Sequence, residues 1–240
     1  MTLNELISEL WLDVNPEISD DSVLDKRLLA AFIHKVRAVF ARNEMNKSSR
    51  TVDAALIQDL GLVELETVDS FVDSGLGNIL HTILRTKEII PRAIELHNKL
   101  AFTYVGSLDQ VQKGFKFIDI ANVPYFGNGK FNKVFMAAFI MNDRIHIIGN
   151  CNNPAFKGLK YINVKGVFEN PEDAAKFYRP GGTPCYTEDE AYPLPLYLWQ
   201  YIKKEIIQFD LRQFYVPLAD PINNADNDIN KFDLNEKVKN

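Results

Sequence analysis

The chain has 240 residues and a formal net charge of -5, with 46% hydrophobic and 25% charged residues. This supply of apolar side chains is enough for a hydrophobic core and excludes an intrinsically disordered chain. The mild negative charge argues against a protein that coats nucleic acid with its whole surface, although it leaves room for a local basic patch. No run of eighteen apolar residues occurs, so we expect no membrane-spanning segment.

Two helices are predicted in the N-terminal part, residues 1–60. Thr2 and Glu5 have the spacing of a capping box, in which each side chain accepts a hydrogen bond from the backbone of the other residue. Residues 19–22 are helix-capping serines and acids, and they predict a second, longer helix that ends near Asn46. The expected buried face of this helix consists of Leu29, Phe32, Ile33, Val36 and Phe40.

A β-rich part is predicted over residues 61–192. Apolar residues alternate over 63–67, and the short apolar segment 79–84 is bounded by turn residues, so both are predicted strands. Residues 101–168 are expected to form an antiparallel meander, with turn chemistry at 141–143. The strands expected in the meander are 102–105, 115–120, 134–140, 144–148 and 161–168. A short helix capped by Asn170 follows.

The C-terminal part is predicted to be an amphipathic helix over 193–216 and an extended arm over 217–240. The apolar stripe of the helix consists of Leu198, Trp199, Ile202, Ile206 and Phe209. The arm is rich in Asn and Asp, as is typical either of a frayed tail or of a segment that reaches a neighbouring subunit. Helices, then strands, then a helix predict an α+β fold in one composite domain.

The sequence contains no convincing catalytic or metal-binding motif. The four histidines include no HExxH pair, and His146 lies between apolar neighbours, as is typical of a structural histidine. The glycine-rich segment 126–131 lacks the hydroxyl residue of a phosphate-binding loop, so a hairpin turn is the better interpretation. We therefore expect no catalytic residue, no bound metal and no cofactor.

The second predicted helix carries only basic charges from Lys26 to Asn43. We interpret Lys35, Arg37 and Arg42 as candidate interface residues that lie off its apolar stripe. This basic face is either simply solvated, or it meets acids of a neighbouring subunit or phosphates of DNA. If it is exposed, the double change of Arg37→Glu with Arg42→Glu leaves the monomer folded and blocks assembly.

The C-terminal arm contains the other candidate interface residues. Asp220, Asp226 and Asp228 are expected to pair with basic groups, and Phe232 is expected to dock into a groove of a neighbour. The arm has too few apolar residues to form a core of its own, so we expect a partner to order it in the assembled state. The alternative is a tail that is disordered everywhere, in the assembled state as well as in the free subunit.

Several segments occur in an order that resembles a known family. They are, in chain order, KVRAVFARNEMNK, VELETVD, ILRTKEIIPRAIEL, VKGVFENPEDAA and YPLPLYLWQYIKKEIIQFDLRQF, followed by the arm pattern D-x-x-N-N-A-D-N-D. Together they resemble virion structural proteins of short-tailed crAss-like bacteriophages. In that family, ring or adaptor subunits are stacked below the portal and join head to tail.

The resemblance implies a non-enzymatic head-to-tail connector subunit in the virion neck or tail, assembled in the cytoplasm of the bacterial host. It implies about twelve copies in a ring, to match the usual symmetry of a portal. The implied partners are copies of itself, the portal, other neck or tail proteins, and genomic DNA that passes without sequence-specific binding. The alternatives are a nucleic-acid-binding module that uses the basic second helix and, with less support, a small hydrolytic enzyme.

Overall fold

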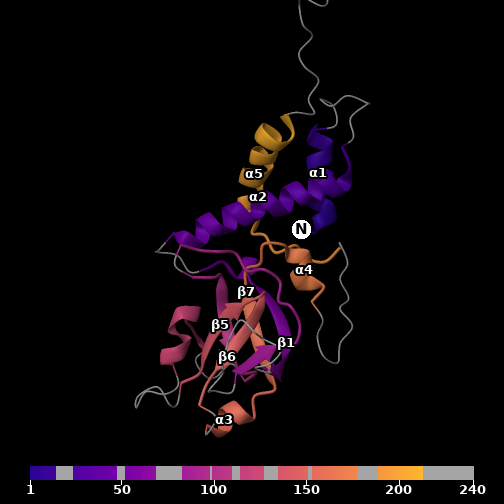
Figure 1. Ribbon diagram of the computed structural model, residues 1–240. Helices are drawn as coiled ribbons and strands as arrows, with labels where there is room; N and C mark the ends of the chain where they lie inside the picture. Colours follow the sequence, from indigo (N-terminus) through magenta and orange to yellow (C-terminus); the bar gives the residue numbers. More distant parts are fainter. Residues whose placement is uncertain are drawn as a thin grey trace, which may run out of the picture.

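The three longest helices gather at one end of the molecule, and a β-sheet with short helices beside it forms the other end, as the computed structural model shows (Figure 1). This arrangement confirms the α+β fold class. The structure describes residues 1–14, 24–47, 52–68, 83–97, 99–109, 114–126, 135–150, 153–177 and 189–212. Its helices are α1 (Leu3–Val14), α2 (Lys26–Asn46), α3 (Pro154–Lys157), α4 (Pro171–Ala175) and α5 (Leu196–Glu205). Short 3-10 helices occur at Ala54–Leu56 and Ile120–Tyr125.

The first helix begins at the capping box that the sequence predicts. The backbone N–H of Thr2 donates to Oε2 of Glu5 over 2.9 Å, and the N–H of Glu5 donates to Oγ1 of Thr2 over 3.2 Å. These two bonds satisfy donors that the first helical turn would otherwise leave without partners. The buried side of α1 consists of Leu3, Leu6, Ile7, Leu10 and Val14.

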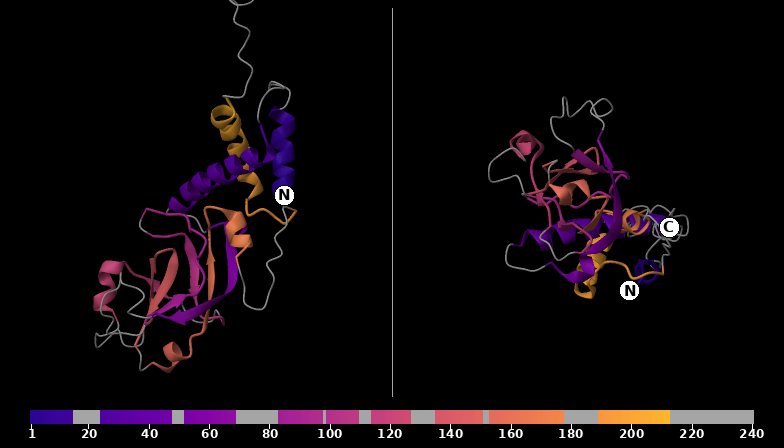
Figure 2. Two further views of the ribbon diagram at one scale, coloured as in Figure 1. Left: turned by 45° about the vertical axis from the view of Figure 1, so that its right-hand side comes forward. Right: turned by 90° about the horizontal axis from the view of Figure 1, so that it is seen from below.

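The second helix ends at Asn46, as predicted. Leu29, Ile33 and Val36 are buried, while Phe32 and Phe40 are half-buried against the same cluster. Further along α2, Ala41 joins a different cluster, in which Leu56, Ile94, Leu96, Ala101 and Val167 surround it. Thus α2 is covered from two sides, by helices on one and by loops and strand ends of the β-rich part on the other (Figure 2).

The last helix changes its pitch, and this change corrects one prediction. Leu198, Trp199 and Ile202 are buried as expected, but Phe209 is 68% exposed. Residues 206–210 form a π-helical turn, closed by a 2.9 Å bond from the N–H of Leu211 to the carbonyl oxygen of Ile206. A π turn advances by a smaller angle per residue than an α turn, so Leu211 reaches the core in place of Phe209.

Seven strands form one sheet in the order β3-β7-β1-β2-β6-β5-β4. They are β1 (Gln58–Thr67), β2 (Ile83–Thr86), β3 (Phe102–Gly106), β4 (Lys116–Phe117), β5 (Ala137–Met141), β6 (Arg144–Ile148) and β7 (Tyr161–Gly166). The expected meander is wrong, because β7 lies between β3 and β1 and because β4 runs parallel to β5. A parallel pair needs a crossover, and residues 118–136, with the 3-10 helix at Ile120–Tyr125, provide its length.

The hairpin between β5 and β6 is the local part of the sheet that the sequence predicts best. Asn142 and Asp143 have φ of 51° and 56°, the left-handed backbone that a two-residue hairpin turn requires. Met141 pairs with Arg144 across this turn. The predicted Asn170 cap is also confirmed, since its side chain accepts from the N–H of Glu172 at the start of α4.

Each end of the molecule has its own hydrophobic cluster. In the helical end, Leu10, Leu29 and Trp199 are the centre of a cluster that joins α1, α2 and α5. In the sheet end, Ile147 and Val164 belong to a cluster that extends to α4. No helix in the described ranges is both long enough and apolar enough to cross a bilayer.

Candidate interaction surfaces

Large apolar side chains are exposed on the outer side of α5 and of the π-helical turn that continues it. Leu196, Tyr197, Tyr201 and Phe209 are 68%, 50%, 62% and 68% exposed, respectively. Single exposed apolar residues are normal, but three aromatic side chains within thirteen residues, on one side of a helical rod, are typical of a contact surface. We call Tyr197, Tyr201 and Phe209 the outer α5 face, whereas Leu196 lies nearer the core, beside Leu6 and Trp199.

Polar contacts on the opposite side hold α5 against α1. The carboxylate of Glu9 accepts from Nε1 of Trp199 over 2.8 Å and from Nζ of Lys203 over 2.7 Å. Lys203 also pairs with Asp13 over 2.5 Å. The hydrogen bond from Lys203, aided by the one from Trp199, lowers the pKa of Glu9 below its ordinary value. The outer α5 face therefore has a defined orientation relative to the rest of the helical end.

The basic face of α2 is smaller than the sequence suggests. Lys26, Arg27, Lys35 and Arg42 are exposed. Lys35 is engaged within the chain, because its Nζ lies 2.6 Å from Oδ1 of Asp210. This ion pair joins α2 to the last turn of the α5 rod and is worth little by itself at an exposed position.

Arg37 is fully buried, so the prediction that it lies on the exposed side of α2 is wrong. Its Nε donates to the carbonyl oxygen of Pro193 over 2.8 Å, and its Nη1 donates to that of Phe168 over 3.0 Å. The guanidinium also lies 5.7 Å from the centre of the Tyr192 ring. Arg37 is buried because α2 is packed against other segments on two of its sides. Two N–H groups of its planar guanidinium donate to carbonyl groups from two segments that are distant in the sequence.

Beside Arg37, His34 forms a second polar link between the two ends of the molecule. Its Nδ1 lies 2.8 Å from the hydroxyl of Tyr192, and its Nε2 lies 3.1 Å from Oε1 of Glu172 in α4. Burial lowers the pKa of His34, and the carboxylate of Glu172 opposes this shift only in part. A neutral ring that donates from Nε2 and accepts at Nδ1 fits both contacts.

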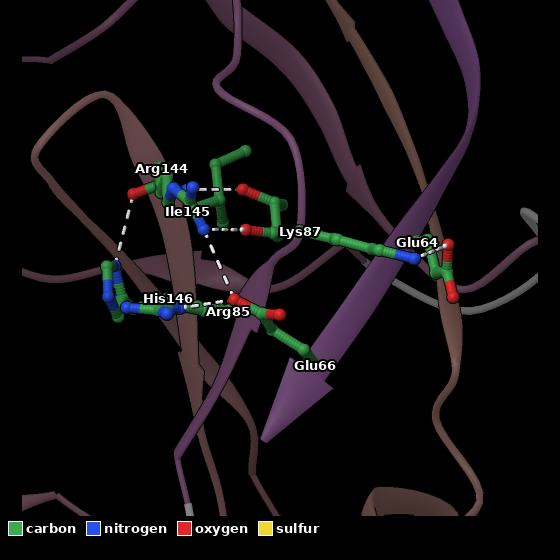
Figure 3. A network of polar contacts seen from close by, with 8 residues as sticks. Glu64, Glu66, Arg85, Lys87, Arg144, Ile145 and His146 are labelled. Atoms are coloured by element: carbon green, nitrogen blue, oxygen red, sulfur yellow. Dashed lines mark hydrogen bonds and ion pairs between the residues drawn. The ribbon is translucent and has the colours of Figure 1, made fainter. Parts of the chain in front are cut away.

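On the sheet, charged side chains form a ladder across β1, β2 and β6 (Figure 3). Oε1 of Glu66 accepts from Nε of Arg85 over 2.7 Å and from Nη1 of Arg144 over 3.2 Å. Lys87 reaches Glu64 over 3.3 Å, as the same view shows. These pairs tie three strands together, and each charge has an opposite charge beside it. The ladder is therefore a structural feature of the sheet.

The described residues show no cluster with the chemistry of a metal site. No group of three or more His, Cys, Asp or Glu side chains there could hold a metal ion. His146 is buried, its ring is stacked on Phe139 with centroids 5.1 Å apart, and its Nδ1 donates to the carbonyl oxygen of Arg144. This confirms a structural histidine.

Comparison with known proteins decides the family. Residues 5–229 match the family CrAss Ring 2, described as phage tail ring protein 2. The chain belongs to this family of phage tail ring proteins. No curated protein matches the chain. The resemblance to ring proteins of crAss-like phages is thereby confirmed, and the chain is a structural component of the virion that associates with its own copies in the tail.

The structure places only some of the predicted interface residues of the ring protein. Lys35 and Arg42 are exposed on α2, whereas Arg37 is not. Asp220, Asp226, Asp228 and Phe232 lie outside the described residues, as does the rest of the arm. The predicted interface residues do not include the outer α5 face, although the sequence contains a signal for it. That signal is Tyr197 and Tyr201, one helical turn apart, on the side opposite Trp199.

Proposed function

We propose that this ring protein is a structural, non-enzymatic subunit that joins the portal to the tail in the neck region of the phage. It acts by assembly, and its ring surrounds part of the passage through which genomic DNA leaves the head. Its partners are its own copies, the portal and other neck or tail proteins, and its subunits assemble in the host cytoplasm.

The extent of the family match is the observation that carries this proposal. It runs from α1 through the sheet and α5 and continues to residue 229, so it covers the helical end, the sheet end and part of the arm. A ring needs head-to-tail contacts, in which one surface of a subunit meets a different surface of the next. We propose about twelve copies, because that number matches the usual symmetry of a portal.

The structure gives less support to the alternative of a nucleic-acid-binding module than the sequence does. It requires a basic stripe along α2, but Arg37 is buried and Lys35 pairs with Asp210. Lys26, Arg27 and Arg42 remain exposed, and this charge suits a contact with neighbouring acids or a weak contact with phosphates.

Electron microscopy of purified phage particles, combined with mass spectrometry of their proteins, tests the proposal. We expect the protein to remain with particles after density-gradient purification and to form a closed ring between portal and tail. A two-fold dimer with isologous contacts, or absence of the protein from particles, would contradict it. A ring at another level of the tail would contradict the portal-joining role alone.

A further inference from the structure

We infer that the outer α5 face is the docking site for the C-terminal segment 213–240 of the neighbouring copy in the ring. This segment adds residues 213–216 to the predicted arm over 217–240 and is called the arm in the steps below. This inference rests on the proposed function, because it requires that copies meet head to tail. It goes further by naming which surface of one copy receives which segment of the next.

The first step is that Tyr201 and Phe209 of the outer α5 face contribute little to the core of their own subunit. The core contacts of α5 come from Leu198, Trp199 and Ile202, on the other side of the helix. Tyr201 and Phe209 are 62% and 68% exposed, so most of their surface remains in water. Aromatic side chains held on a rigid helix are the residue type that dominates binding energy in protein interfaces.

The second step concerns where the arm begins. The described chain ends at Arg212, directly after the α5 rod, and this end of the rod points away from the sheet (Figure 1). The arm has 28 residues, counted from 213 to 240, so its extended length is at most about 90 to 100 Å. A folded unit of this size has a radius of gyration of roughly 17 Å, so the arm is long enough to reach the adjacent subunit.

The third step is the chemistry of the arm. Its large apolar residues are Phe214, Tyr215, Val216, Leu218, Ile222, Ile229, Phe232, Leu234 and Val238. The arm carries five acids and three lysines, a net charge of -2, and the exposed charges of the α5 rod are Lys204, Glu205 and Arg212. Apolar side chains can cover the aromatic rings while the acids meet Lys204 and Arg212. The family match includes the arm up to residue 229, so this segment belongs to the pattern of the family.

The fourth step favours the neighbour over the arm's own subunit. To cover Tyr201 and Phe209 of its own chain, the arm would have to turn back along the α5 rod, whereas an arm that continues in the direction of the rod leads away from its own subunit. In a head-to-tail ring every copy presents the same α5 face, so each arm finds an equivalent site on the next copy.

Photo-crosslinking in assembled particles tests the contact directly. Full-length protein with Tyr201→benzoylphenylalanine, supplied from a plasmid during infection, keeps an aromatic side chain at the site. We expect irradiation of particles to give a product of twice the subunit mass, with the linked peptide inside residues 213–240. A link to the arm of the same chain, to another part of the ring protein, or to a different virion protein would overturn the inference.

Removal of the aromatic surface or of the arm, separately and together, provides a second test. Tyr201→Ser with Phe209→Ser removes the aromatic surface, and truncation after Pro217 removes most of the arm and leaves α5 intact. We expect each change to lower incorporation into particles about tenfold or more, and the combination to be no worse than either alone. Normal incorporation of the truncated chain, or fully additive losses, would overturn the inference.

Matched controls separate docking from folding. Ile89→Ser removes a side chain that is 63% exposed but lies after β2, and we expect it to incorporate normally. Thermal melting of each purified variant should match that of the wild type. If the double serine variant melts early, the truncation and the crosslink still decide the question. Wild-type protein that is absent from particles would reject the proposed function, whereas wild-type rings with a different crosslink would reject only this inference.

Discussion

Nη1 of Arg37 donates to the carbonyl oxygen of Phe168 over 3.0 Å, although the two residues are 131 positions apart. The bond joins the middle of α2 to the chain just after β7, and Nε of the same guanidinium holds the carbonyl oxygen of Pro193 ahead of α5. One side chain therefore links three segments at the boundary between the helical end and the sheet end. No described carboxylate pairs with it, so its contribution depends on these carbonyl groups.

Arg37→Met should destabilise the protein by about 3 kcal/mol, because two buried carbonyl groups lose their donors while the aliphatic volume is kept. Urea unfolding followed by circular dichroism would measure this change. Arg42→Met is the matched control, since Arg42 is exposed, and it should change stability by less than about 0.5 kcal/mol. Equal effects of the two changes would contradict the bracing role of Arg37. It follows that Arg37→Glu cannot serve as a surface variant.

Stability should fall as the pH is lowered through the range in which His34 titrates. Burial places the pKa of folded His34 below its ordinary value of 6.5, so the unfolded chain takes up a proton first. The stability from the neutral ring is fully present above pH 6.5 and is lost as the pH falls through the folded pKa. Unfolding curves from about pH 7.5 to about pH 5.5 should therefore be less pH-dependent for His34→Gln than for wild type.

His97→Gln is the control for this pH dependence, because His97 is exposed. Its unfolding curves should follow those of the wild type across the same range. A His34→Gln protein with unchanged pH dependence would show that the link from His34 to Glu172 and Tyr192 does not contribute as inferred.

Trp199→Phe should cost about 1 kcal/mol near neutral pH, because it keeps a ring in the core but removes the hydrogen bond to Glu9. The pKa of Glu9 lies below its ordinary value of 4.5, so the carboxylate contributes above that pH. This contribution is lost as the pH falls through the lowered pKa, and the cost of the substitution should then shrink. Circular dichroism is the suitable readout, since the change removes a fluorophore. Tyr201→Phe should have no such pH-dependent effect.

Arg27→Glu with Arg42→Glu should leave the subunit folded and reduce its incorporation into particles. Both side chains are exposed on α2, so their reversal should affect contacts with neighbouring acids or phosphates and leave the core unchanged. Thermal melting and the amount of tagged protein in purified particles would measure the two effects. Normal incorporation would mean that this basic face is only solvated.

The sequence by itself determined those features that depend on residues within one or two turns of each other. The capping box of Thr2 and Glu5 and the turn at Asn142–Asp143 each need only local geometry, and both formed as predicted. The buried stripe of α2 around Ile33 followed from helical spacing alone. The family was also accessible from the order of segments along the chain.

Only the tertiary structure decided the features that depend on distant residues. The position of β7 between β3 and β1 reflects pairings over long separations, for which the local pattern has no signal. Arg37 looks like a surface residue until the carbonyl groups of Phe168 and Pro193 are placed beside it. Regular α-helical spacing places Phe209 in the core, but the π-helical turn at residues 206–210 leaves it exposed and Leu211 is buried in its place.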